Sequence, residues 1–94
     1  MELKFVWNKR KNAINIGKHG VSFSMAAMAF SDPRYYCWYD SEHSSLIEDR
    51  WKIIGLSGCD LLTVNYTEKD DYIRIISARK ADKREEEEYF CGYS

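Results

Sequence analysis

Three strand-like segments, 51–56, 61–67 and 72–78, follow one another in the second half of the chain with only short links between them. The links, 57–60 and 69–71, consist of Ser, Gly, Asp, Cys and Lys residues and have the character of turns. Because links this short cannot carry a crossover, consecutive strands must run antiparallel and lie side by side. The chain is thereby constrained to contain an antiparallel sheet.

The remaining segments predict further strands and helices around this sheet. Asn8 and Ser22 can cap helices by accepting hydrogen bonds from the first turn, and Gly20 tolerates the left-handed conformation that closes a helix. The expected elements are a strand at 3–7, helices at 9–18 and 23–30, an aromatic strand at 35–39, the three strands above, and a helix that starts with the Asp82 and Glu85 capping box and runs through Tyr89. The prediction is one α+β domain over residues 1–94, a small antiparallel sheet with helices packed on one side of it.

Alternation along 61–67 gives the expected sheet two different faces. Apolar and polar side chains alternate there, with Leu62, Val64 and Tyr66 on one face and Thr63, Asn65 and Thr67 on the other. We expect the first face to bear the core and the second to meet water or a ligand. The run of glutamates at 85–88 is expected to be a solvated face of the last helix.

The charges of the chain nearly cancel in total but are segregated along it. The formal net charge is −1, which predicts no strong nonspecific attraction to nucleic acid or membrane. Residues 1–20 nevertheless carry +4 and residues 67–80 carry +1, whereas 21–66 and 81–94 carry −3 each. A basic face is expected where the first and third segments meet.

Features that mark secreted, membrane or metal-binding proteins are missing from the sequence. There is no run of roughly 18 apolar residues and no apolar N-terminal stretch, so we expect a cytoplasmic protein without a membrane span. Cys37, Cys59 and Cys91 are widely separated and have no zinc-site spacing, which favours reduced thiols. No metal or other cofactor is expected.

The candidates for chemistry are four cations and one imidazole. No nucleotide-binding loop, zinc-protease helix or nucleophile elbow is present. The cations are Lys18, Arg50, Arg74 and Arg79, and His19 follows the first of them. A planar guanidinium suits phosphate oxygens, so two such arginines can hold a scissile phosphodiester.

Each candidate also has a purely structural explanation. Lys18 and His19 can stabilise the negative end of a helix dipole. Arg50 follows two carboxylates and can form a surface ion pair with them. Arg79 can serve the carbonyls of a strand end or the acidic last helix. These alternatives stay open at the level of sequence.

The chain resembles the BrnT family of bacterial toxins over nearly its whole length. The most specific pieces are KHGVSF at 18–23 and IRIISARKA at 73–81. Further shared positions are Trp7-Asn8, Lys11-Asn12, Phe30 with Asp32-Pro33, Glu48-Asp49-Arg50-Trp51, Ile54-Gly55, Val64 with Tyr66-Thr67-Glu68, and Glu85 with Tyr89.

This resemblance implies the toxin of a type II toxin–antitoxin pair with a RelE-like fold. Such a toxin is an endoribonuclease that arrests growth and is held inactive by a BrnA-type antitoxin. The antitoxin's ribbon-helix-helix domain binds operator DNA, so the toxin reaches DNA only through its partner. Carried over position by position, the resemblance gives Lys18, His19, Arg50, Glu68, Arg74 and Arg79 as the candidate catalytic residues.

The chemistry of these residues is compatible with metal-independent RNA cleavage. The neighbouring 2′-OH is the nucleophile, so the protein needs a base, an acid and cations for the charge that builds on phosphate. His19, with an intrinsic pKa of about 6.5, can act as either acid or base. Glu68 or Tyr66 can assist proton transfer, although aromatic packing is the commoner use of a strand tyrosine.

Two other functions remain open. The chain can be a non-catalytic RNA- or antitoxin-binding module that acts as a corepressor of its operon. A metal-dependent nuclease is the third possibility, but the sequence lacks the carboxylate cluster that would hold Mg²⁺.

Overall fold

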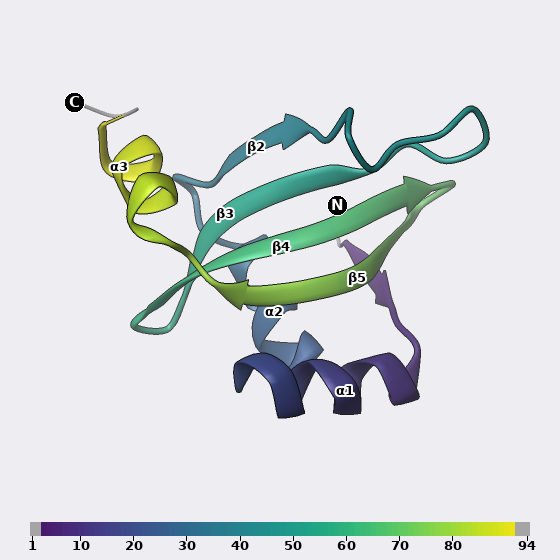
Figure 1. Cartoon of the computed structure of the whole chain (residues 1–94), viewed down its shortest axis with the longest axis horizontal. Helices are drawn as coiled ribbons and strands as arrows, with labels where there is room; N and C mark the ends of the chain where they lie inside the picture. The colour runs from purple at the N-terminus through teal and green to yellow at the C-terminus, as the bar shows by residue number, and fades with distance from the viewer. Residues whose placement is uncertain (1–2, 92–94) are drawn as a thin grey trace.

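The computed structural model describes residues 3–91 (Figure 1). Its elements are β1 (Lys4–Val6), α1 (Lys9–His19), α2 (Phe23–Ala29), β2 (Tyr36–Tyr39), β3 (Trp51–Ser57), β4 (Asp60–Lys69), β5 (Tyr72–Lys80) and α3 (Lys83–Cys91). Every predicted element is present. No helix within the described range is long and apolar enough to cross a membrane.

The five strands form one mixed sheet in the order β1-β5-β4-β3-β2. Strands β2 to β5 are antiparallel neighbours, as their short links predict. β1 instead runs parallel to β5, with Phe5 opposite Ile73, so the prediction of a purely antiparallel sheet is wrong at this edge. The reason is that α1 and α2 intervene after β1, and a connection of that length allows either direction.

The core lies between α2 and one face of the sheet. Phe23, Ala26 and Ala29 of α2 are fully buried against the apolar side chains of β3, β4 and β5. The ring of Phe30 packs edge-on against Tyr66, with 4.9 Å between ring centroids. This is the face that the alternation of 61–67 assigned to the core, and that prediction is confirmed.

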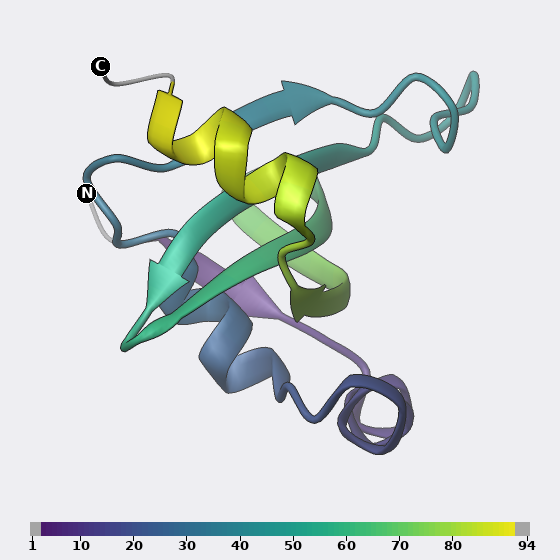
Figure 2. The ribbon, with the colours of Figure 1, turned by 60° about the vertical axis from the view of Figure 1, so that its left-hand side comes forward.

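α3 lies on the opposite face of the sheet from α2 (Figure 2). The strand register places Ile54, Thr63 and Arg79 in one row on this second face, which we call the outer face. Ile54 is fully buried there, and Arg79 binds Glu85 of α3. The prediction that all helices pack on one side is therefore wrong, because the short turn after β5 turns the chain back over the outer face.

α1 is attached to the sheet mainly through side-chain amides. Asn15 is buried, and its Nδ2 donates to the carbonyls of Val21 at 2.8 Å and Ala78 at 2.7 Å. Its Oδ1 accepts from the Ala78 amide at 3.1 Å, so Asn15 pairs with β5 as a neighbouring strand would. Asn12 accepts from the Phe23 amide at 2.8 Å and fixes the start of α2.

The predicted helix ends are confirmed. Asn8 and Ser22 accept hydrogen bonds from amides in the first turns of α1 and α2. Gly20 ends α1 with φ of 68°, in the left-handed region where a side chain would be strained. The capping box at the start of α3 also forms, as described below.

Candidate functional site

Away from α3, the outer face of the sheet is polar and partly open to solvent. Lys52, Asn65 and Ser77 form a row across β3, β4 and β5, and each is partly exposed. Asn65 Nδ2 donates to Ser77 Oγ at 2.8 Å, which fixes the centre of the row. Trp38 of β2 pairs with Lys52 and so extends this row by one residue. The alternation of 61–67 predicted such a polar face, although Thr63 and Thr67 on it are buried.

Arg74 supplies an exposed cation in the next row of this face. It pairs with Thr67 across β4 and β5, at the end of the sheet where β5 begins. Among residues 3–91 no hydrogen bond or ion pair of its side chain is formed. Arg74 is exposed in a shallow hollow that is also lined by Val6, Lys69, Asp70 and Tyr72. Arg50 stands one residue before β3, where its Nε donates to Glu48 Oε1 at 2.9 Å. The surface ion pair considered for Arg50 therefore exists.

Arg79 is held in a two-point ion pair with the last helix. Its Nη1 and Nη2 lie 2.6 and 2.9 Å from the two carboxylate oxygens of Glu85. Burial alone raises the pKa of Glu85, but hydrogen bonds from Arg79 and from the Asp82 amide outweigh it and lower that pKa. The hydrogen bonding with Glu85 also raises the pKa of Arg79, although burial alone would lower it. Thus Arg79 does bind the acidic helix, one of the alternatives left open for it.

The glutamate run is only partly solvated. Glu85 is 8% exposed and completes the capping box: its amide donates to Asp82 at 2.8 Å, and its carboxylate accepts from the Asp82 amide at 2.9 Å. The other glutamates, 86–88, are exposed as expected. The expectation of a solvated face is wrong for Glu85 because its position in the first turn brings it against Arg79.

Lys18 and His19 are exposed at the C-terminal end of α1. Asn15, one turn earlier, is bonded to Ala78, and the C-terminal end of α1 lies on the side of the molecule where β5 ends (Figure 1). Arg79 lies at the same end, whereas Arg74 is about 16 Å away along the strand at about 3.3 Å per residue. The structure thus does not bring all candidate cations into one concavity.

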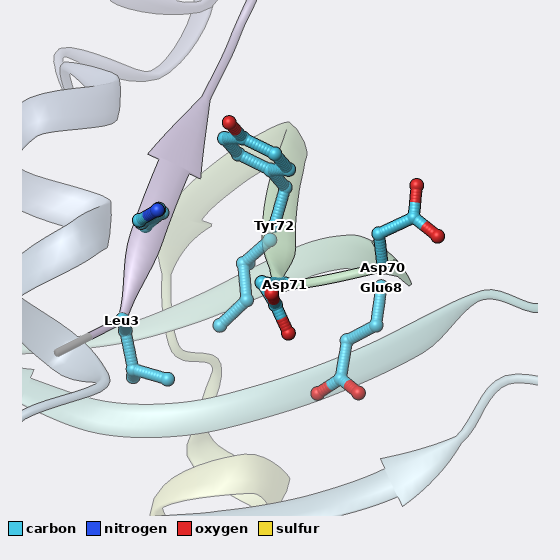
Figure 3. Close-up of a pocket in the computed structure, with 7 residues that line it drawn as sticks. Leu3, Glu68, Asp70, Asp71 and Tyr72 are labelled. Atoms are coloured by element: carbon cyan, nitrogen blue, oxygen red, sulfur yellow. The ribbon is translucent and has the colours of Figure 1, made fainter. Parts of the chain in front are cut away.

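Glu68 faces a different environment from the cations. It shares the strand face of Tyr66, not that of Arg74, and lines a hollow of about 620 Å³ beside the β4–β5 turn (Figure 3). Asp70 and Asp71 also line this hollow, and Glu68 and Asp70 point away from each other. In the described part of the chain no group of three His, Cys, Asp or Glu could hold a metal. An acidic hollow repels phosphate.

Tyr66 serves the core. Its side chain is 5% exposed and packs on Phe30. Burial, together with the neighbouring Cys37 and Glu68, raises the pKa of its hydroxyl. A hydroxyl that holds its proton this firmly is a poor proton donor, and it stays protonated near neutral pH and so cannot accept a proton. The packing role is therefore the one that the structure supports.

Sequence reasoning missed several residues that organise the site. Lys52 is two residues after Arg50, and residues at that spacing in a strand lie on the same face. This spacing could have indicated Lys52 as a further cation of the site. Asp32 is buried and accepts hydrogen bonds from the Leu56 amide at 2.8 Å and from the Tyr89 hydroxyl, which joins α3 to β3. Burial alone raises its pKa, but these bonds lower it overall. No sequence pattern indicated this contact.

Comparison with known proteins identifies one family. The family model that matches is described as "Ribonuclease toxin, BrnT, of type II toxin-antitoxin system", and the match covers residues 7–85. All six candidate catalytic residues fall within it. No curated protein gives a significant match to the chain.

Proposed function

The chain belongs to the BrnT family of ribonuclease toxins of type II toxin–antitoxin systems, and on that premise we propose that it is a metal-independent endoribonuclease. It cleaves RNA along β5 and the outer face of the sheet, in a RelE-like manner, and arrests growth. A BrnA-type antitoxin neutralises it in the cytoplasm and carries the pair to operator DNA. The chain's own net charge of −1 gives it little attraction to DNA.

The observation that carries this proposal is the uncovered outer face with its unpaired cation. Arg74 is exposed and has no carboxylate partner in the described range, while Lys52 stands across the face. Asn65 and Ser77 lie between them and offer hydrogen bonds to sugar and phosphate. Such a surface binds a single RNA strand through its backbone, as ribonuclease substrates require.

Proton transfer is assigned to the C-terminal end of β5. His19 removes the 2′-OH proton or protonates the leaving 5′-oxygen, and Lys18 beside it stabilises the charge on phosphate. Glu85 fixes the guanidinium of Arg79, whose side chain stays 36% exposed. Arg79 can therefore contribute a positioned positive charge without being freed from its ion pair. Arg74 holds the strand farther along.

The test is cleavage of single-stranded RNA by the purified chain in the presence of a chelator. We expect cleavage by wild type and a loss of at least about tenfold for Arg74→Ala, since one phosphate contact is worth roughly 1.4 kcal/mol or more. Arg84→Ala is the matched control: it removes the same charge from α3, where the Arg84 side chain is 89% exposed. His19→Gln should abolish cleavage without unfolding the chain.

The non-catalytic corepressor is the alternative outcome of the same test. The corepressor is favoured by two ion pairs: Arg50 and Arg79, two of the four candidate cations, already bind carboxylates of the chain itself. Folded wild-type chain that binds its antitoxin but leaves RNA intact and does not arrest growth would replace the ribonuclease by this module. Cleavage that stops with the chelator would instead indicate a metal-dependent enzyme.

A further inference from the structure

α1 has the reverse of the usual polarity of a surface helix. Such helices normally bury apolar side chains and expose polar ones. In α1 the buried residue is Asn15, whereas Ile14 is 50% exposed and Ile16 is 44% exposed. Ala13 and Gly17 are exposed as well. Around the helix Ile14 and Ile16 lie on either side of Asn15, and Ala13 and Gly17 lie roughly opposite it, so α1 leaves these apolar and small residues outside the core.

The hydrogen bonds of α1 explain how it stays in place without apolar burial. Asn15 makes three bonds to the backbone at Val21 and Ala78, and Asn12 makes one to Phe23. These contacts fix which side of the helix faces the sheet. Folding does not determine which residues occupy the outward side. That side includes Ala13 and Ile14, whose apolar side chains prefer to leave water.

The outward side forms a ridge with a defined shape. Arg10, Ala13, Ile14 and Gly17 are spaced i, i+3, i+4 and i+7, so they lie on one face of α1. A side chain added at Gly17 would meet no atom within 4 Å, which shows how open this point is. Small residues at 13 and 17 allow the backbone of another helix to approach closely, and Ile14 supplies the apolar contact.

The charges around the ridge are all of one sign. Residues 9–19 contain no Asp or Glu, and the cations that surround the apolar residues are Lys9, Arg10, Lys11 and Lys18. A complementary surface is apolar in its middle and carries carboxylates at its edges. The phosphate backbone of RNA offers negative charge but no apolar surface to cover Ile14. A protein segment with both features therefore fits this surface better than RNA does.

We propose that α1 is the docking face for an acidic amphipathic segment of the antitoxin. The family supplies an antitoxin as partner, and the ridge with its basic rim defines the chemistry of the segment that binds. A second copy of this chain is a weaker candidate. Its acidic helix α3 would have to meet α1, and a two-fold dimer would have to join α1 of each copy to α3 of the other at the same time.

Docking on α1 also places the partner next to the proposed proton-transfer residues. Lys18 and His19 form the last turn of the same helix. A segment that covers the ridge shields them from RNA, so binding and neutralisation become one event. This inference rests on the antitoxin partner and not on RNA cleavage, so the two can fail separately.

The experiment measures binding of the purified antitoxin, encoded by the reading frame adjacent to this chain's own, by calorimetry. Ile14→Ser should weaken binding at least about tenfold, because it removes the exposed apolar contact at the centre of the interface. Ile47→Ser is the matched control, since Ile47 is 96% exposed on the β2–β3 loop. The affinity of Ile47→Ser for the antitoxin should equal that of wild type. Amide exchange in the complex should show protection along 13–18.

Every other outcome overturns the proposal. Equal affinities for Ile14→Ser and wild type, or α1 amides that exchange as fast in the complex as in the free chain, would place the antitoxin elsewhere. Protection of 13–18 by a single-stranded RNA oligonucleotide, and not by the antitoxin, would make α1 a nucleic-acid surface. Self-association of the free chain that Ile14→Ser abolishes would make the occupant a second copy.

Discussion

At the scale of single residues, the contact between Arg79 and Glu85 has two roles. Glu85 caps α3 through Asp82 and at the same time orients Arg79 at the end of β5. One carboxylate therefore joins the last helix to a candidate catalytic cation. If α3 unfolds locally, Glu85 moves with it, and Arg79 loses the contact that orients its guanidinium.

The pH dependence of stability should reveal this contact. Glu85 has a folded-state pKa below its ordinary value of 4.5, so its contribution is fully present above that value. It is lost as the pH falls through the lower folded-state pKa, because the folded chain must then take up a proton. Glu85→Gln should lower the free energy of unfolding by about 1–3 kcal/mol near neutrality, and by progressively less as the pH falls below 4.5 toward the folded-state pKa.

Urea unfolding at several pH values measures this difference, with Glu87→Gln as the control on the exposed side of α3. Asp32 also has a lowered pKa, so its protonation in acid destabilises the fold as well. Because Asp32 is present in every variant, its effect on the free energy of unfolding cancels in the comparison. A difference between wild type and Glu85→Gln that stayed constant from neutral to acid pH would contradict the assignment.

At the scale of elements, the sequence predicted the helices and strands themselves better than their arrangement in space. Period-two alternation located β3, β4 and β5, and capping residues located the helices. The direction of β1 could not be predicted, because three residues carry no signal for parallel or antiparallel pairing. The placement of α3 depends on contacts of Glu85 and Tyr89 with residues distant in sequence, and no local pattern reports such contacts.

The candidate site was predictable to the same extent. The resemblance supplied the residues, but strict alternation would put Arg74 and Arg79, which are five residues apart, on opposite faces. They share the outer face because the pairing of β4 with β5 shifts register between Asn65 and Tyr66, and no sequence pattern indicated this irregularity. Their separation along β5 and the ion pair of Arg79 follow from three-dimensional packing. The inverted polarity of α1 was hidden as well, since Asn15 looks like an ordinary exposed residue until its partners at Val21 and Ala78 are known.

The packing of α2 on β3 makes a prediction about glycine. A Cβ at Gly55 would collide with the backbone carbonyl of Ala29 at the end of α2. Gly55→Ala should therefore destabilise the chain by about 1–3 kcal/mol, as overpacked cores do. Gly17→Ala, at an open position in the last turn of α1, should stabilise it by about 0.5–1 kcal/mol through helix propensity. Chemical denaturation checks both, and equal effects of one sign would refute the close approach of α2.

At the scale of the whole molecule, the near-zero net charge conceals two distinct surfaces. Cations gather on α1 and along β5, and carboxylates gather on α3 and at the β4–β5 turn. We assign α1 to the antitoxin and the outer face to RNA. α1 adjoins β5 through the hydrogen bonds of Asn15 with Ala78, and Arg79 on the outer face is the next residue of that strand. One partner can thereby occupy its own surface and block the other.

The same architecture predicts which part of the molecule opens first. β4 is central in the sheet and hydrogen-bonded on both sides, so its amides should exchange only on global unfolding. α1 buries no apolar side chain and depends on Asn12 and Asn15, so we expect it to open at a lower free energy. Native-state hydrogen exchange should show protected amides of α1 exchanging at least about tenfold faster than those of β4.

Asn15→Ala sharpens this prediction, because it removes the pairing with Ala78 and leaves the strands β2 to β4 untouched. Exchange in α1 should accelerate further while that in β4 changes only with global stability. Bound antitoxin should reverse the effect, since a partner on the exposed ridge supplies the apolar burial that α1 lacks by itself. If α1 and β4 exchanged at one common rate in the free chain, α1 would be part of the cooperative core, and its exposed isoleucines would need another explanation.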